Sequence, residues 1–233
     1  MIDGDLKIEL CGEEMWLLPE RAMYWAGAGT LLIADPHWGK AASFRAHGVP
    51  VPSGTTSEGV ARMDSILDRT APRRIVFLGD FLHARAGRSP EMLDALNLWR
   101  RRRSGIELLL VRGNHDRHAG DPPGGMGIEC VDAPHPIFPF VLAHHPGSSP
   151  DGHLIAGHVH PGVRLYGAGG LRERLPCFVI GRDTTILPAF GDFTGLADAE
   201  PDSGARVFAV TPDRVIEIVA SPLHHPFFSR PEC

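Results

Sequence analysis

Several apolar stretches of this 233-residue chain end in Asp, Asn or His. The segment "GNHD" at 113–116, for example, follows the apolar run "IELLLVR" directly. These side chains are costly to bury without partners, so we expect them at the mouth of a strand, facing a polar ligand.

Seven residues share this position at the end of an apolar run. They are Asp35 and His37 in "ADPH", Asp80 in "GDFLH", Asn114 in "GNHD", His144 in "LAHH", and His158 and His160 in "GHVH". The carboxyl ends of strands in an open α/β sheet line one crevice, so we predict that these residues converge. His145, beside His144, is an alternative to it.

The predicted cluster supplies two carboxylates, one amide oxygen and four imidazoles, with no thiolate. Such donors suit Mn²⁺, Fe²⁺ or Zn²⁺, and seven of them exceed what one tetrahedral ion takes. Two ions ~3.5–4 Å apart clamp the attacking and leaving oxygens of phosphoryl transfer. The sequence therefore predicts a two-metal site for phosphate ester hydrolysis. For any single residue, the simpler alternative is a buried, hydrogen-bonded side chain.

A regular alternation of elements precedes and positions these residues. Short apolar runs predict buried strands at 30–35, 73–80, 106–113 and 138–145. Helical spacing of apolar residues predicts helices over 57–70 and 89–103, the second opened by Ser89 as its N-cap. This order indicates a mainly parallel sheet.

The helical period disappears after about residue 125. Strand-like runs follow at 153–160, 162–167, 175–181, 205–210 and 214–220, and the last two read as a hairpin. We therefore predict an α/β fold in which two packed β-sheets are flanked by helices, an αββα sandwich. No linker divides the chain, so residues 1–233 are predicted to form a single domain.

Composition limits the cell compartment and the partners. Cys11, Cys130, Cys177 and Cys233 lie far apart, which argues against disulfides and favours the reducing cytoplasm. The acidic N-terminal segment is not a signal peptide, and no apolar run is long enough to span a membrane. A net charge of −5 gives no global attraction to nucleic acid. The local cluster at 100–103 is either the last turn of a helix or a DNA contact.

The ordered motifs resemble the calcineurin-like metallophosphoesterase superfamily over residues 30–160. The resemblance implies that one ion is held by Asp35, His37, Asp80 and His160, and the other by Asp80, Asn114, His144 and His158. His144 is preferred to His145 because it follows the apolar run, as the lone His of the superfamily does. The resemblance also implies that His115 protonates the leaving oxygen.

His83 narrows the resemblance within the superfamily. Protein phosphatases of the superfamily carry an Asp at this position, three residues after the bridging Asp. A His at this position resembles the pattern of the DNA-repair nucleases. The runs "LLIADPHWGKAASFRAHGVPVP", "RRIVFLGDFLHAR", "LLLVRGNHDRH" and "LIAGHVHPGVRLYG" resemble the ligase-associated DNA damage response endonucleases. This group implies manganese-dependent cleavage of DNA, single-stranded in our interpretation, and a functional link to a DNA ligase and a helicase.

Further residues near these motifs have alternative roles. His83 either contacts substrate, polarises His115 or makes a supporting hydrogen bond. Asp116 either orients His115 or caps a helix. Lys40 and Arg45 either contact phosphate oxygens or form structural salt bridges. Trp38 either stacks on a base or packs beneath the metal loop.

Three functions remain open from the sequence. The first is a DNA endonuclease or phosphodiesterase, which His83 and the arginines favour. The second is a phosphatase or phosphodiesterase for nucleotides or other small phosphate esters, which the acidic net charge favours. The third is a scaffold without activity, which an intact set of seven ligands opposes.

Overall fold

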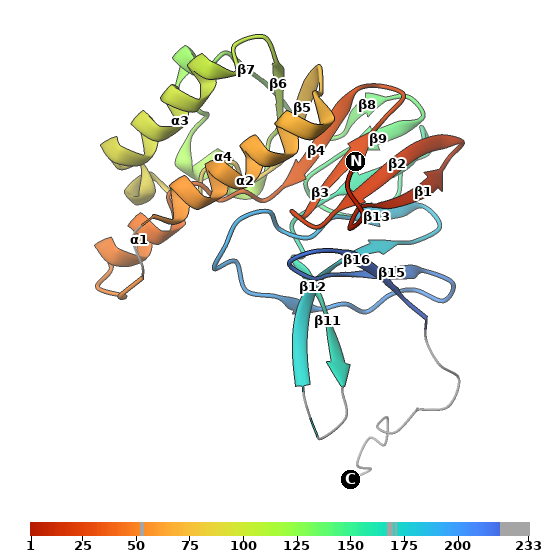
Figure 1. The fold of residues 1–233 in the computed structure, drawn as a ribbon. Coiled ribbons are helices and arrows are strands. Elements are labelled where there is room, and N and C mark those ends of the chain that lie inside the picture. The colour runs from red at the N-terminus through yellow and green to blue at the C-terminus, as the bar shows by residue number, and fades with distance from the viewer. Residues whose placement is uncertain (52–53, 167–169, 171, 220–233) are drawn as a thin grey trace.

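Two β-sheets lie face to face, and helices cover the outer face of the first (Figure 1). The computed structural model describes residues 1–51, 54–166, 170 and 172–219. The seven strands of the first sheet follow one another in chain order: β1 (Leu6–Leu10), β2 (Glu13–Leu18), β3 (Ala22–Trp25), β4 (Thr30–Ala34), β5 (Arg74–Leu78), β6 (Glu107–Val111) and β7 (Ile128–Val131).

The second sheet is built from the later part of the chain. Its path runs β14-β11-β12-β13-β10-β9-β8, with β15 pairing on β12 and β16 on β15. The strands are β8 (His135–Ile137), β9 (Phe140–Leu142), β10 (His153–Ala156), β11 (Pro161–Tyr166), β12 (Arg172–Ile180), β13 (Thr184–Ile186), β14 (Ala197–Asp198), β15 (Arg206–Val210) and β16 (Val215–Ile218).

The helices of the described residues all precede β7. They are α1 (Lys40–Ala46), α2 (Thr55–Thr70), α3 (Pro90–Arg102), α4 (Asn114–Ala119) and the 3₁₀ turns η1 (Arg85–Gly87) and η2 (Gly124–Met126). The predicted alternation is confirmed as β4-α2-β5-α3-β6, with β4, β5 and β6 parallel. Ser89 caps α3 as predicted, because its Oγ accepts a hydrogen bond from Met92 N at 3.3 Å.

An antiparallel meander, β1 to β3, extends the first sheet and was not predicted. Its strands alternate buried and exposed residues: Ile8 and Leu10 face the core, whereas Lys7 and Glu9 face solvent. β1 is rich in charge and β2 opens with two glutamates, so neither is the wholly apolar run that marks β4 to β6. The sequence signal of the meander is therefore weaker.

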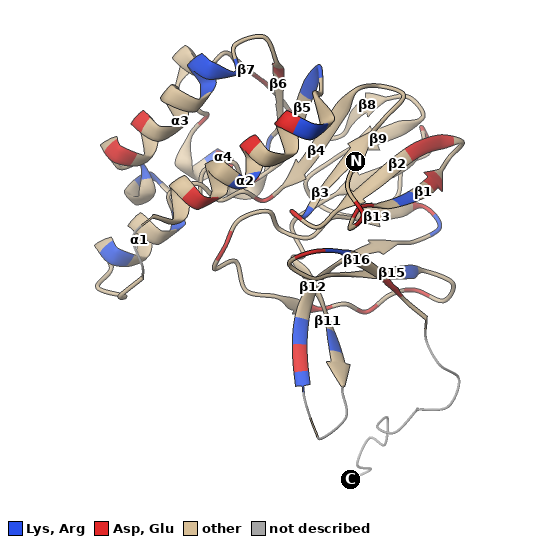
Figure 2. Cartoon of the chain, in the orientation of Figure 1, with Lys and Arg blue, Asp and Glu red and all other residues tan. Residues whose placement is uncertain are grey.

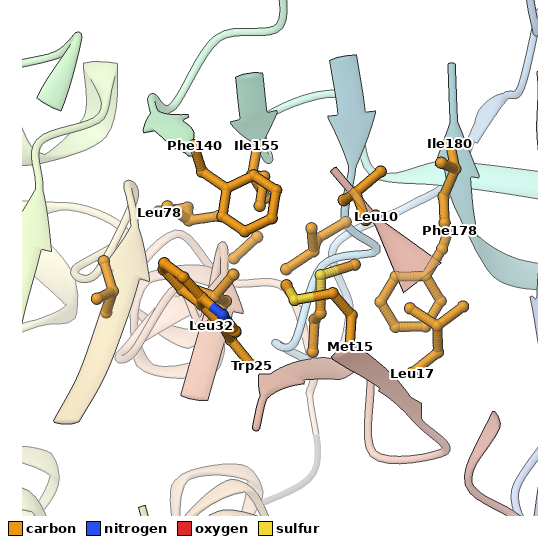
Figure 3. Close-up of a cluster of buried hydrophobic side chains, with 14 of the residues drawn as sticks. Leu10, Met15, Leu17, Trp25, Leu32, Leu78, Phe140, Ile155, Phe178 and Ile180 are labelled. Carbon is orange, nitrogen blue, oxygen red and sulfur yellow. The ribbon is translucent and has the colours of Figure 1, made fainter. Parts of the chain in front are cut away.

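The core between the sheets joins the two halves of the chain. One buried cluster combines Met15, Leu17, Trp25 and Leu32 of the first sheet with residues of the second such as Phe140 (Figure 3). The rings of Trp25 and Phe140 meet edge to face, with centroids 4.9 Å apart. This packing confirms the predicted α/β sandwich of two sheets.

The helix layer packs on the opposite face of the first sheet. Met63 and Ile66 of α2 and Leu96 and Trp99 of α3 belong to a second buried cluster with the outward side chains of β4, β5 and β6. In the described part of the chain, the α-helices thus cover the first sheet. The predicted αββα arrangement would place helices on the second sheet as well.

Charged residues lie mostly on the helices and outer strands (Figure 2). The arginine cluster at 100–103 lies in the last turn and at the end of α3, as the helix-end alternative predicted. Arg100 donates to the carbonyls of Met126, Arg103 and Ile106, and Arg103 pairs with Asp64 at 2.8 Å and Asp68 at 2.7 Å. These arginines therefore hold the end of α3.

Two sequence expectations concern compartment and membrane. Cys11, Cys130 and Cys177 are free thiols, and Cys233 lies outside the described residues. No helix in the described ranges combines the length and apolar character needed to cross a membrane.

Phe140→Ala should destabilise the protein by about 3–5 kcal/mol, because it empties a fully buried site between the sheets. Urea unfolding measures the change. Phe138→Ala is the matched control, since this ring is 86% exposed and its loss should leave stability within about 0.5 kcal/mol. Equal effects of the two variants would contradict the packing described.

Candidate metal centre

The seven predicted ligand residues come from strand ends of both sheets. Asp35 and His37 follow β4, Asp80 follows β5 and Asn114 follows β6, all in the first sheet. His144 follows β9, and His158 and His160 follow β10, in the second sheet. The structure brings these side chains together in one place.

Asp80 lies between the two halves of the cluster. Its Oδ2 is 3.6 Å from His37 Nε2, and its Oδ1 is 3.4 Å from His144 Nε2. Oδ1 also accepts a hydrogen bond from the backbone N–H of His115 at 2.9 Å. One carboxylate is therefore within reach of two groups of nitrogen donors.

The imidazole nitrogens face one another in two pairs. His37 Nε2 lies 3.3 Å from His160 Nε2, and His144 Nε2 lies 3.0 Å from His158 Nδ1. Asn114 Oδ1 is 2.9 Å from the same His144 nitrogen. Ligand atoms directed at a common point are what a metal ion requires.

Hydrogen bonds to backbone carbonyls set the tautomers of two of these rings. Nδ1 of His144 donates to Leu78 O at 3.1 Å, and Nδ1 of His160 donates to Thr194 O at 3.0 Å. In both residues the lone pair of neutral imidazole is therefore on Nε2, the atom directed into the cluster.

The hydrogen bonding of Asp35 indicates whether the cluster suits a cation. Its Oδ2 accepts a hydrogen bond from His158 N at 2.8 Å. Its Oδ1 is buried and has no hydrogen-bond partner among the described residues. A buried carboxylate oxygen without a donor is unfavourable unless a positive charge compensates it. A divalent ion fits this requirement.

The backbone is strained at the cluster. Nine described non-glycine residues have a positive φ, and five of them are predicted ligands. Left-handed conformation is unfavourable for residues with a Cβ and tends to gather at functional sites. The five are Asp35 (φ 50°), His37 (φ 47°), Asp80 (φ 49°), His158 (φ 71°) and His160 (φ 51°).

Glycines precede ligand residues because neighbouring strands approach closely there. A Cβ at Gly113 would overlap Asp80 Oδ1 and come within 2.6 Å of Asp80 N. A Cβ at Gly157 would lie 2.5 Å from Asp35 Oδ2 and 2.7 Å from Ala34 Cβ. The absence of a side chain at each glycine therefore lets the next loop reach the carboxylate.

Burial keeps most of the imidazoles neutral. It lowers the pKa of His37 to about 2, and the charges of Lys40 and His160 add to this effect. Burial also lowers the pKa of His144 to about 4, against the opposing charge of Asp35. Neutral imidazole is the form that binds metals. Burial raises the pKa of Asp80, an effect partly offset by the hydrogen bond from His115 N.

His160 differs from the other rings. Burial works to lower its pKa, but the nearby carboxylate of Asp35 and the hydrogen bond to Thr194 O outweigh burial and raise it. Its Nε2 lies 3.8 Å from Asp35 Oδ2. Among the four predicted histidine ligands, His160 is thus the one whose pKa is raised.

His115 and His83 lie beside the cluster. Nδ1 of His115 donates to the backbone carbonyl of His83 at 2.7 Å, which leaves Nε2 facing Asp80 Oδ2 at 3.8 Å. The two rings are stacked, with centroids 5.0 Å apart. The side chain of His83 itself is directed at His37, with 3.4 Å between their Nδ1 atoms.

Asp116 has a capping role. It is buried, and its carboxylate accepts hydrogen bonds from Gly113 N at 2.9 Å and Leu82 N at 3.3 Å. It therefore ties the start of α4 to the loop after Asp80. Burial raises its pKa to about 6. The helix-capping alternative from the sequence is confirmed.

The remaining predicted residues lie at different distances from the cluster. Lys40 is half-buried and shares a cleft with His37, whereas Arg45 lines a separate cleft on α1 and α2 and donates to Val51 O at 3.4 Å. Trp38 is buried in the core on the helix side of the first sheet. This agrees with the packing role that the sequence left open for it. His145 is exposed and packs its ring on His158, with centroids 4.0 Å apart.

Comparison with solved structures finds an informative likeness. The crystal structure of the Pseudomonas putida nuclease MPE matches with a TM-score of 0.81 and 41% identity, over 92% of this chain and 100% of that chain. No protein-family model and no curated protein matches the chain.

Two further solved structures are much less similar. A protein of unknown function from Aquifex aeolicus, AQ665, has a TM-score of 0.37 and 17% identity, over 60% of this chain and 81% of its own. The Escherichia coli phosphoesterase Yfce has a TM-score of 0.39 and 14% identity, over 81% and 97%. At these TM-scores neither likeness informs the fold or the site.

Two packed sheets with His, Asp and Asn donors at their strand ends define the class of metal-dependent phosphoesterases. At 41% identity over nearly the full length of both chains, the protein belongs to the metallophosphoesterase nuclease family of the Pseudomonas enzyme. The resemblance drawn from the sequence motifs is confirmed.

Gly113→Ala should weaken binding of divalent metal about 10- to 100-fold, the size of effect typical of groups that support ligands. The added methyl overlaps Asp80, and the contact with Asp80 N cannot be relieved by rotating a side chain. Calorimetric titration with Mn²⁺ measures the change. Gly105→Ala is the control, since its added methyl would meet no other part of the described chain within 4 Å. Unchanged affinity of Gly113→Ala would show that this close approach does not position the metal ligands.

Proposed function

We propose that this protein is a DNA endonuclease that hydrolyses phosphodiester bonds with two divalent ions. The observation that carries the proposal is the position of Asp80 between two sets of donors, from a chain that belongs to a nuclease family. One carboxylate shared by two ions is the arrangement that serves phosphoryl transfer.

The proposed ligands divide around Asp80. Asp35, His37, Asp80 and His160 hold one ion, and Asp80, Asn114, His144 and His158 hold the other. His144 is preferred to His145 because it is buried and its Nε2 is directed at Asn114 and Asp80, whereas His145 is exposed. We propose Mn²⁺, with Fe²⁺ or Zn²⁺ as alternatives, because the set mixes oxygen with imidazole and contains no thiolate.

The bound ions supply an activated water and neutralise charge on the phosphate oxygens. His115 acts as the general acid, because its Nδ1 is held by His83 O and its Nε2 faces the carboxylates where the phosphate binds. His83 positions His115 through its backbone carbonyl and through ring stacking. As an imidazolium protonated on both nitrogens, His115 would deliver the Nε2 proton to the departing sugar oxygen and keep the Nδ1 proton on His83 O.

Lys40 and Arg45 have different support as substrate contacts. Lys40 lies in the cleft beside His37, and its pKa is lowered by burial against the opposing charges of Asp80 and Asp35. It is placed to meet a phosphate oxygen. Arg45, in its separate cleft, is placed to meet the DNA backbone away from the cleaved bond.

We assign the enzyme to the cytoplasm, on the three free thiols. The motif resemblance supports single-stranded DNA as the substrate and DNA repair, linked to a ligase and a helicase, as its context. The alternative is a phosphatase or phosphodiesterase for nucleotides or small esters, which the net charge of −5 favours because it repels polyanions.

With Mn²⁺, the protein should cleave circular single-stranded DNA and also bis(p-nitrophenyl) phosphate. Asp80→Ala, purified in the same way, should lose both activities, because the shared ligand is gone. The paired substrates are compared by gel and by absorbance. Cleavage of the small diester alone would favour the alternative function, and DNA cleavage that survives in Asp80→Ala would point to a contaminating nuclease.

His115→Ala should slow DNA cleavage by ~10²–10⁴-fold, since the departing sugar oxygen needs a proton. The same variant should cleave bis(p-nitrophenyl) phosphate almost normally, because p-nitrophenolate leaves readily as an anion. Rates on the two substrates are measured at matched Mn²⁺ concentration. Equal losses on both would remove His115 from the role of general acid.

A further inference from the structure

The loop between β13 and β14 is fastened to the metal centre. Phe190 N donates to Ala34 O at 2.8 Å, and Gly191 N donates to Asp35 O at 3.1 Å. Thr194 O accepts the hydrogen bond from His160 Nδ1 at 3.0 Å. The segment 190–194 therefore contacts ligand residues from both sheets.

Two arginines hold this loop in place. Asp192 pairs with Arg21 at 3.1 Å and with Arg62 at 3.2 Å. Arg62 also donates to Phe190 O at 2.5 Å, and Arg21 donates to Gly191 O at 3.3 Å. In Figure 1 the loop lies below α2, consistent with its link to Arg62 of that helix. Its backbone is thus fixed by several independent contacts.

Phe193 is the unusual residue of the loop. Its side chain is 50% exposed, whereas Phe190, three residues earlier, is 1% exposed. Its φ of 59° lies in the left-handed region, which is unfavourable for a bulky residue. A glycine would adopt this backbone without strain, and an exposed ring contributes little to the core. Packing and local conformation therefore do not account for a phenylalanine here.

The position of Phe193 suggests what its ring contacts. The cleft that contains His37 and Lys40 is lined on another side by Phe193, together with Thr55 and Thr56 at the start of α2. A phosphodiester at the metal centre would have its charged oxygens near Lys40. The cleft is too narrow for a nucleoside, so the group attached to that phosphate would lie outside it, against the exposed face of Phe193.

We propose that Phe193 is a stacking platform for a nucleobase next to the cleaved phosphodiester. This inference rests on the proposed nuclease function and deepens it. Stacking on an aromatic ring requires a base that is not already stacked in a duplex, and it tolerates any base because each has a π-face. The platform therefore selects unpaired or distorted DNA without selecting sequence.

The test compares two single-stranded oligomers, oligo(dT) and an oligomer of the same length with abasic sugars throughout. They share phosphodiesters and charge, but the second has no bases. Wild-type enzyme with Mn²⁺ should cleave oligo(dT) with a kcat/KM roughly 5- to 150-fold higher, the equivalent of ~1–3 kcal/mol for one stacked base. Phe193→Ala and Phe193→Gly should reduce this ratio to near one, and Phe193→Trp should retain it.

The variants separate stacking from structural damage. Phe193→Gly accommodates the positive φ, so it removes the ring while keeping the loop conformation. Phe138→Ala is the matched control, because it also removes an exposed ring. Phe138 lies before the start of β9, and His144 of the metal centre follows the other end of that strand. Its ratio should equal that of the wild type.

Two results would overturn the stacking role, and they differ from failure of the nuclease proposal. Glycine and alanine variants that keep the wild-type ratio, or that lose activity equally on both oligomers, would show that Phe193 does not bind a base. If wild-type enzyme cleaves neither oligomer but cleaves bis(p-nitrophenyl) phosphate, the nuclease function itself fails.

Discussion

Two buried carboxylates, Asp35 and Asp80, lie among imidazoles that burial keeps largely neutral, and this unbalanced negative charge is the constraint on which the site depends. Lys40 is near both, but it is a single half-buried cation whose own pKa is lowered by burial. Buried charge without compensation is strongly unfavourable. Divalent cations would resolve the imbalance and would also use the nitrogen lone pairs directed inward. The left-handed backbone at five of the ligand residues is unfavourable as well, and it is maintained where the surrounding loops are held by many contacts.

Neither sheet contains a complete set of donors. The first contributes Asp35, His37, Asp80 and Asn114, and the second contributes His144, His158 and His160. The distance between the sheets therefore decides whether the donors meet, so the core formed by residues such as Trp25 and Phe140 also positions the predicted ligands. The loop 190–194 adds a direct link, because it binds the backbone after β4 and the ring of His160. The packing between the sheets that stabilises the fold thus also brings the predicted ligands together.

The sequence predicted the parts of the fold that have strong local signals. Continuous apolar runs marked β4, β5 and β6, and apolar periodicity with the Ser89 cap marked α3. The β1–β3 meander was missed because β1 alternates charge with apolar residues and β2 opens with two glutamates, and α1 and α4 were missed because they are short. Motif order identified which side chains gather and left the capping role of Asp116 open, but it carried no information on the backbone carbonyl of His83 as the partner of His115 or on the exposure of Phe193. These features depend on contacts between segments far apart in the chain.

The central claim is that Asp80 is shared by two ions, and electron paramagnetic resonance of the protein titrated with Mn²⁺ tests it most directly. We expect two ions per chain, with a spin-coupled spectrum once both are bound, because a bridging carboxylate places them close together. Asp80→Ala should abolish the coupling. A plateau at one ion per chain, or two ions with only the spectrum of isolated Mn²⁺, would contradict the shared carboxylate.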